Sequence, residues 1–218
     1  GFKDDKGEIV GLDIDMAKEA AKRAGMEVEF KAIDWSSKEA ELKSKKIDAL
    51  WNGLTVSPER EKNILFSNPY MKDKQYIVVR NEDESIKSKA DLAGKVVECQ
   101  ADSSAEAALK EDPDLTATFG QLLTTADYNT AFMDLQQGSV DAIAMDVIVA
   151  GYQIQQRKAD FKILDDSLSA EEYGVGFKKG NTELRDKVQA ALEDMAKDGT
   201  LKEISEKWFG EDVTTIGK

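Results

Sequence analysis

The chain has 218 residues, of which 41% are hydrophobic and 33% are charged, a balance that predicts a folded protein with a buried core. Its 30 basic and 43 acidic side chains give a formal net charge of -13, which repels nucleic-acid phosphates and anionic lipid headgroups, so we expect no nucleic-acid partner. No apolar run approaches the roughly 18 residues of a membrane-spanning helix and no hydrophobic leader precedes GFKDDKGE, so we expect the chain as given to be soluble.

Two residue types that carry much of protein chemistry are scarce. Cys99 is the only cysteine, so no disulfide can form within the chain, and its place in KVVECQ favours a small core residue. The sequence contains no histidine, which removes the commonest general base and the commonest metal ligand. Phosphate-loop, dinucleotide, zinc and calcium motifs do not occur either. We therefore expect no catalytic residue, no cofactor and no metal site.

Helices and short strands alternate along the chain, which predicts α/β layers and a mainly parallel sheet. The first alternation runs from a helix over 13–25, ended by Gly25, through a strand over 26–33 and a helix over 36–46 to a strand over 47–55. The second runs from a strand over 95–100 through a helix over 103–112, a strand over 116–120 and a helix over 126–138 to a strand over 140–146. Extended stretches are predicted over 70–81 and 171–181, and helices over 182–197 and 201–210.

One pattern occurs twice along the chain. Residues 39–53 and 131–146 each combine a helix, a short turn and a strand that opens with Asp-Ala after Ile or Val. Two lobes of similar build would explain the repeat, although helix-turn-strand units are common in α/β proteins. The two extended stretches would then cross between the lobes, so that the second lobe is inserted in the first and hinge motion is possible.

A polar stretch, WNGLTVSPER at residues 51–60, begins within the last predicted strand of the first alternation and continues beyond it. In open α/β sheets ligands bind beyond the carboxyl ends of the strands. Asn52 and Thr55 offer polar side chains there, and Gly53 lets a ligand approach the backbone. Strand alternation directs Trp51 to the opposite face, which favours core packing over ligand stacking.

Arg60 occupies an unfavourable place in the same stretch. Ser57 is a preferred helix N-cap and Pro58 a preferred first helical residue, so Arg60 falls in the first turn. The positive end of the helix dipole disfavours a cation at that position. Arg60 could pair with a surface acid such as Glu59 or Asp73, but its placement after a glycine-containing strand end favours an anionic ligand.

Two further segments place polar groups at strand ends. In ECQADSSAEAAL, Ser103 and Glu106 form a capping-box pattern, and the hydroxyls of Ser103 and Ser104 with the helix N-terminus suit a carboxylate, although a simple helix cap gives the same pattern. In AIAMD, Asp146 could cap the next helix or hold an ammonium group. Together with Arg60, these groups predict a receptor for a zwitterion.

With these residues in view, the chain resembles the extracytoplasmic solute-binding proteins of ABC transporters, in the polar amino-acid branch known as family 3. The matching segments are GEIVGLDIDMAKEAAKRAG, KKIDALWNGLTVSPEREKNILFSNPYM, DLAGKVVECQADSS, VDAIAMD, EEYGVGFKKGN and DGTLKEISEKWFG. The resemblance implies a type II periplasmic-binding fold of two similar α/β lobes. Lobe 1 would span residues 1–70 and 174–218, lobe 2 residues 75–169, and the hinges about 70–74 and 169–173.

The resemblance also implies roles for site residues and for the protein. It implies that Gly53 and Thr55 contact the amino group and carboxylate of the ligand. Further carboxylate contacts are implied for Arg60, Ser103 and Ser104, and an ammonium contact for Asp146. Asn52 and Met145 would contact the ligand side chain. The protein would be a non-catalytic monomer outside the cytoplasm, in the periplasm or lipid-anchored. It would close on an L-amino acid between its lobes and deliver it to a membrane permease.

The sequence departs from the family pattern at two places. Asp102 stands where the family usually has glycine before its two hydroxyl residues, so we expect its carboxylate to point away from a bound anion. The sequence opens at GFKDD, after the strand and aromatic loop with which the family pattern begins, and ligand selectivity is the property most affected. Two other functions remain open: a dehydratase-like enzyme on the same fold, and the ligand-sensing domain of a membrane receptor.

Overall fold

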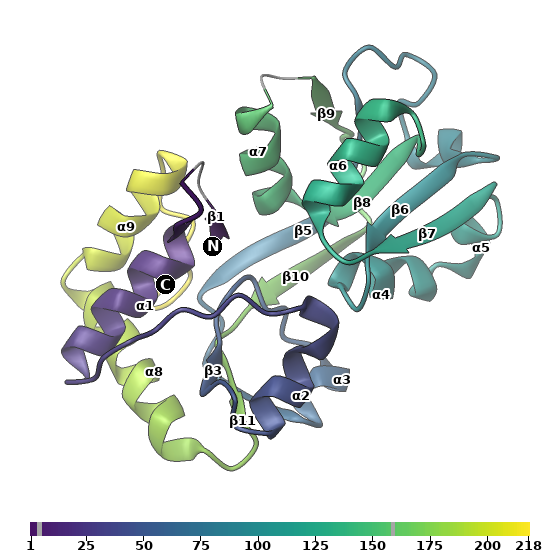
Figure 1. Ribbon diagram of the computed structural model, residues 1–218. Coiled ribbons are helices and arrows are strands. Elements are labelled where there is room, and N and C mark those ends of the chain that lie inside the picture. Colours follow the sequence, from purple (N-terminus) through teal and green to yellow (C-terminus); the bar gives the residue numbers. More distant parts are fainter. Residues whose placement is uncertain (4–5, 158–159) are drawn as a thin grey trace. The chain divides into compact units, whose positions relative to one another are not determined.

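The computed structural model describes residues 1–3, 6–157 and 160–218 (Figure 1). The helices are α1 (Leu12–Arg23), α2 (Lys38–Lys43), α3 (Pro58–Glu61), α4 (Ser104–Glu111), α5 (Pro113–Thr116), α6 (Tyr128–Gln137), α7 (Val147–Gln156), α8 (Thr182–Lys197) and α9 (Thr200–Phe209). The strands are β1 (Phe2–Lys3), β2 (Ile9–Val10), β3 (Ala49–Leu50), β4 (Ile64–Phe66), β5 (Met71–Arg80), β6 (Val96–Gln100), β7 (Gln121–Thr125), β8 (Ala142–Asp146), β9 (Phe161–Ile163), β10 (Ser169–Tyr173) and β11 (Gly176–Lys178). Across the described ranges, no helix combines the length and apolar character needed to cross a membrane.

The chain divides into two compact units. Unit 1 comprises residues 1–33, 37–72 and 172–218, and unit 2 comprises residues 34–36 and 73–171. The boundary at residues 72 and 73 lies inside β5, and the boundary at residues 171 and 172 lies inside β10. At these two points the chain passes from one unit to the other within a strand. The predicted hinges at residues 70–74 and 169–173 stay a prediction. So do the predicted bounds of lobe 1 (1–70 and 174–218) and lobe 2 (75–169).

Unit 1 combines a small sheet with a group of three helices. The strand order is β3-β11-β4, and β11 is antiparallel to both neighbours. The helices α1, α8 and α9 pack against one another (Figure 1). Trp208 on α9 donates its indole N–H to Asp15 on α1 at 2.9 Å, and Arg23 contacts Asp198 at 2.7 Å. Trp208 therefore anchors the last helix to its own unit.

The strand predicted over residues 26–33 is wrong. Residues 26–34 have no regular secondary structure, and no described strand pairs with them. Most of their side chains are exposed, and Val28 is 41% exposed. The alternating pattern is a property of the segment alone, whereas a strand also requires a hydrogen-bonded neighbour. The strand predicted over 47–55 is likewise reduced to Ala49–Leu50, with an isolated bridge at Thr55.

Unit 2 contains a mixed sheet, which corrects the prediction of a mainly parallel one. The strand order is β10-β5-β8-β6-β7, and β9 also pairs with β5. Strand β6 is parallel to β7 and β8, but β5 is antiparallel to β8 and β9. Helix α4 contributes to the apolar cluster on one face of the sheet, and α6 and α7 contribute to the cluster on the other. The sheet is therefore covered on both faces.

The strand predicted over residues 116–120 is also wrong. Asp112 accepts a hydrogen bond from Leu115 N–H at 3.1 Å, and Pro113 takes the first helical position, so a helical turn extends to Thr116. The strand follows instead as β7, over Gln121–Thr125. The sequence interpretation assigned TATFG to a strand and did not use the Asp-Pro start signal of this turn.

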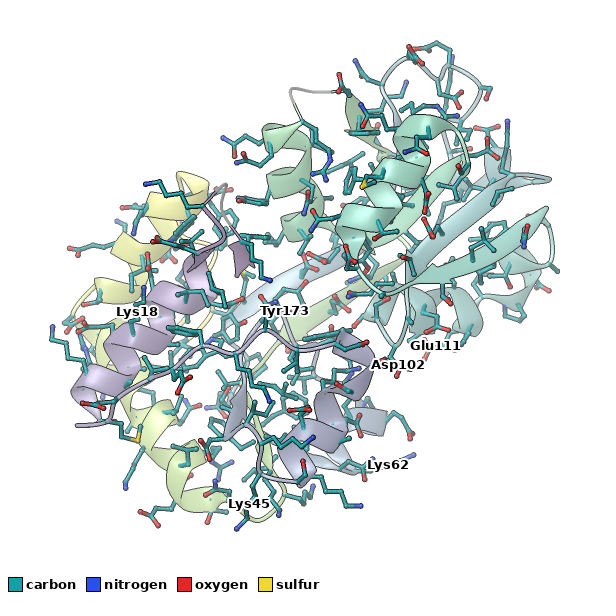
Figure 2. All side chains as sticks on the ribbon, in the orientation of Figure 1. Lys18, Lys45, Lys62, Asp102, Glu111 and Tyr173 are labelled. Atoms are coloured by element: carbon teal, nitrogen blue, oxygen red, sulfur yellow. The ribbon has the colours of Figure 1, made fainter. Side chains whose placement is uncertain are left out.

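The repeated helix-turn-strand pattern is present in both units, as α2 with β3 and α6 with β8. Helix α6 ends at Gly138, which has a left-handed φ of 79°. After α2 the same backbone turn is made by Lys45, with a φ of 60° (labelled in Figure 2). Lys46 N–H then donates to Glu41 carbonyl at 3.0 Å, which closes the last turn. The two segments therefore share a helix ending as well as an order of elements.

Two ionisable side chains of β6 are buried in the core of unit 2. Cys99 is fully buried, and this burial raises the pKa of its thiol to about 12, which confirms an inert core residue. Glu98 is 4% exposed and pairs in register with Leu123 and Ile143. No described donor reaches its Oε2 atom. Burial, and secondarily the charge of Asp134, raises the pKa of Glu98.

Glu98→Gln should stabilise the protein at pH 8 and have little effect at pH 4. Because the pKa of Glu98 is raised in the folded state, its contribution to stability is fully present below the unfolded pKa and is lost as pH rises through the folded pKa. We expect a gain in melting temperature at pH 8 of about 2–4 °C, the shift that about 1 kcal/mol produces in a chain of this size. Glu111→Gln, at an exposed position, is the control (Figure 2). Equal shifts at both pH values would contradict the assignment.

Candidate functional site

In unit 1, the polar stretch after β3 is held to the last two residues of β10. Thr55 forms an isolated antiparallel bridge with Tyr173 and is 6% exposed. The next residue, Val56, donates its N–H to the carbonyl of Glu172 at 2.9 Å. The loop therefore has a fixed backbone, which is what a preorganised binding loop requires.

Gly53 is required by a close aromatic neighbour as well as by its backbone. Its φ of 57° is left-handed, and a Cβ atom added there would lie 3.3 Å from Tyr173 Cε2. Tyr173, labelled in Figure 2, is 3% exposed, and the sequence interpretation did not single it out. Asn52 is exposed and accepts a hydrogen bond from the amino group of Gly1. Trp51 packs against Tyr70 with ring centroids 6.4 Å apart, consistent with the predicted packing role.

Arg60 lies in the first turn of α3, as the sequence predicts. Ser57 is the N-cap, and its hydroxyl accepts the Arg60 N–H at 3.3 Å. The Arg60 guanidinium is half-buried and folds back to donate from Nη1 to the Thr55 carbonyl at 3.1 Å. Glu59 pairs with Lys62. This bond orients the side chain, and a guanidinium presents five N–H donors in a planar fork whose geometry matches a carboxylate.

In unit 2, the capping box at the start of α4 is shifted by one residue. Ser103 accepts the Glu106 N–H at 3.1 Å, as predicted, but Glu106 Oε2 accepts from Asp102 N–H, at 2.7 Å, rather than from Ser103. Asp102 is exposed and has a left-handed φ of 57°, a conformation typical of the glycine that the family pattern places there (Figure 2). Ser104 is the first residue of the helix and is half-buried.

Asp146 ends β8 and caps α7. Its Oδ1 accepts the Val149 N–H at 2.7 Å, so the capping role that the sequence left open is present. The charge of Asp146 also acts on the hydroxyl of Tyr128, the first residue of α6. Burial and then this charge raise the pKa of Tyr128 well above its usual value, so the hydroxyl keeps its proton at neutral pH.

Tyr128 brings two of the predicted site residues of unit 2 together. Its hydroxyl interacts with the Ser103 side chain and with the Gln100 backbone. Ser103 therefore contacts this aromatic hydroxyl directly, and Asp146 acts on it through its charge. The sequence interpretation missed Tyr128, although Asp127 before it is an N-cap, accepting Thr130 N–H at 3.0 Å. Recognising that N-cap would have placed Tyr128 at the same edge as the α4 N-terminus.

Two other features bear on the chemistry of the site. Met145 is fully buried in the apolar cluster under α6, which places it in the core of unit 2. Among the residues that the structure describes, no group of three or more acidic or cysteine side chains is arranged to hold a metal ion. Unit 1 supplies a guanidinium, and unit 2 supplies hydroxyls, helix N-terminal N–H groups and a carboxylate. These groups bind charged ligands and do not by themselves form a nucleophile-base pair.

The comparisons with known proteins agree on one family. Residues 1–211 match the family described as bacterial extracellular solute-binding proteins, family 3. The L-cystine-binding protein TcyJ of Escherichia coli K12 is 35% identical over 214 residues, which cover 98% of this chain and 79% of the relative. The arginine-binding extracellular protein ArtP of Bacillus subtilis is 35% identical over 207 residues, which cover 92% of this chain and 78% of the relative.

Solved structures give the same result for the fold. An ancestral arginine-binding protein bound to arginine aligns with a TM-score of 0.90 and 43% identity, covering 96% of this chain and 92% of the other. A substrate-binding protein of an ABC uptake transporter from Streptococcus pneumoniae, with bound histidine, aligns with a TM-score of 0.94 and 34% identity, covering 99% and 89%. The predicted type II periplasmic-binding fold is confirmed.

A double-mutant cycle tests the close approach of Gly53 and Tyr173. Gly53→Ala should destabilise the protein by more than the roughly 1 kcal/mol typical of a left-handed position, because its Cβ would also displace the Tyr173 ring. Gly180→Ala is the matched control, since Gly180 has a φ of 86° and no neighbour within 4 Å. Adding Tyr173→Leu should recover part of the loss at Gly53 and none at Gly180. Additive effects at Gly53, measured by urea unfolding, would show that the ring does not restrict this position.

Proposed function

The chain belongs to family 3 of the bacterial extracellular solute-binding proteins, and on that premise we propose that it binds an L-amino acid outside the cytoplasm for delivery to an ABC-transporter permease. The match over residues 1–211 carries the proposal. The relatives are named for cystine and arginine, and similar structures hold arginine, glutamine and histidine. These ligands share an α-ammonium and an α-carboxylate, so we infer that the same two groups are recognised here.

The residues of each unit support recognition of a zwitterion. In unit 1, Arg60 offers a guanidinium oriented by the Thr55 carbonyl. In unit 2, Ser103 and the N-terminus of α4 suit a carboxylate, and Asp146 suits an ammonium. We propose ligand contacts at Asn52, Gly53, Thr55, Arg60, Ser103, Ser104 and Asp146. The expectation that one ligand contacts residues of both units stays a prediction.

The named relatives also favour binding over the other functions considered. They are described as binding proteins and not as dehydratases. We propose that the protein is monomeric, that its partner is the permease and that it acts in the periplasm or anchored to the outer face of the membrane. The formal charge of -13 is distributed over the whole chain, so it does not select a cationic ligand at the site.

Binding is tested by thermal shift with L-arginine, L-cystine, L-glutamine and L-histidine, since a ligand that binds the folded state raises the melting temperature. For the amino acid with the largest shift, calorimetry should show that Arg60→Ala loses at least about tenfold in affinity, because a charge-assisted hydrogen bond contributes about 1.5–3 kcal/mol. Arg60→Lys should be intermediate, since it keeps the charge without the planar donor pair.

Arg185→Ala is the matched control in unit 1. Arg185 also donates from Nη1 to a backbone carbonyl, that of Phe66, at 3.4 Å, but it is not a proposed ligand contact. Its replacement should leave the affinity unchanged. Normal binding by Arg60→Ala would refute the site assignment, and no shift with any of the four amino acids would refute the proposed ligand class for them.

A further inference from the structure

Gln75 is a buried polar residue beside the proposed ammonium partner. It lies on β5 in unit 2, is 3% exposed, and stands directly opposite Asp146 in the antiparallel pairing of β5 with β8. Side chains of directly opposed residues lie on the same face of a sheet, with Cβ atoms about 4.5–5.5 Å apart. The Gln75 amide and the Asp146 carboxylate are therefore neighbours at the carboxyl end of β8.

The orientation of the Gln75 amide follows from its other neighbour. Its Nε2 donates to Glu171 Oε1 at 2.5 Å. Glu171 lies on β10, and β10 and β8 flank β5 on opposite sides in the sheet order. Because the carboxylate accepts from the amide nitrogen, Nε2 is the amide atom that faces Glu171, and Oε1 is the other terminal atom of the amide. No donor among the described residues reaches this Oε1 atom, which is itself buried.

The charges around Gln75 Oε1 favour a cationic hydrogen-bond donor for this atom. An ammonium group has three N–H donors and no acceptor. Asp146 can supply the charge, but its Oδ1 already accepts the Val149 N–H at 2.7 Å. A carboxylate on each side of Gln75, at Glu171 and Asp146, disfavours an anion and favours a cation. An uncharged amide oxygen next to Asp146 provides a further acceptor without adding negative charge.

We propose that Gln75 Oε1 accepts a hydrogen bond from the α-ammonium group of the bound amino acid, beside Asp146. This inference rests on the proposed function. Glu171 is a positioning residue in this arrangement, because it holds the amide nitrogen and so presents the oxygen. A ligand without the ammonium group leaves the buried oxygen without a donor, so Gln75 should discriminate between an amino acid and its deaminated analogue.

The experiment compares each variant with two ligands by calorimetry. The probes are the amino acid that binds the wild-type protein most tightly and its deaminated analogue. The analogue pairs are 5-guanidinopentanoate for arginine, 3,3′-dithiodipropionate for cystine, 4-carbamoylbutanoate for glutamine and 3-(imidazol-4-yl)propanoate for histidine. Gln75→Met keeps the length of the side chain and removes the amide. We expect about a tenfold loss of affinity for the amino acid and no loss for the analogue, the effect of one hydrogen bond to a charged group.

The control and the second variant separate ligand contact from folding. Gln153→Met removes another buried amide of unit 2, whose Nε2 donates to Asn129 at 3.3 Å, and should change affinity for neither probe. Glu171→Ala frees the Gln75 amide to rotate and should show a smaller loss, again only for the amino acid. Equal losses for both probes in Gln75→Met, or no loss, would overturn this inference alone. A wild-type protein that binds none of the four amino acids would overturn the proposed function for these ligands, and this inference with it.

Discussion

The antiparallel pairing of β5 with β8 is the constraint on which the rest of unit 2 depends. Its register sets Val78 opposite Ile143 and Gln75 opposite Asp146. A shift of one residue would exchange the two faces of β5 and move its apolar side chains out of their clusters. The same register that fixes the core therefore fixes which polar side chains stand beside Asp146 at the strand end.

The proposed binding residues of both units are held by main-chain contacts near the ends of strands. In unit 1 the bridge between Thr55 and Tyr173 fixes the loop from which Arg60 is oriented. In unit 2, Asp146 is fixed by its strand on one side and by the N–H of Val149 on the other. Groups fixed in this way lose little freedom when a ligand binds, which raises affinity without added contact area.

The helix dipole acts in opposite directions on the two charged candidate residues. Arg60 stands in the first turn of a helix, where the dipole disfavours a cation, and an anionic ligand would offset that cost. Asp146 as an N-cap is favoured by the same dipole effect, so its charge is stabilised before any ligand arrives. Tyr128, whose pKa is raised by burial and by the charge of Asp146, adds a neutral hydroxyl to unit 2.

Local signals in the sequence determined most of the helices, several of their caps and the family. The helix predicted over 182–197 is α8, Thr182–Lys197, and the caps at Ser57 and Ser103 are present, because a helix depends on residues three or four apart. Strand pairing was decided only by the tertiary structure, because a ladder joins residues far apart in sequence. Residues 26–33 have a strand pattern and no described partner, and β5 is antiparallel in a sheet expected to be mainly parallel. Arg60 and Asp146, in contrast, could be singled out from the sequence because their signals lie in neighbouring residues of the chain. Gln75 and Tyr173 became visible only when the fold placed them beside residues that are distant in the sequence.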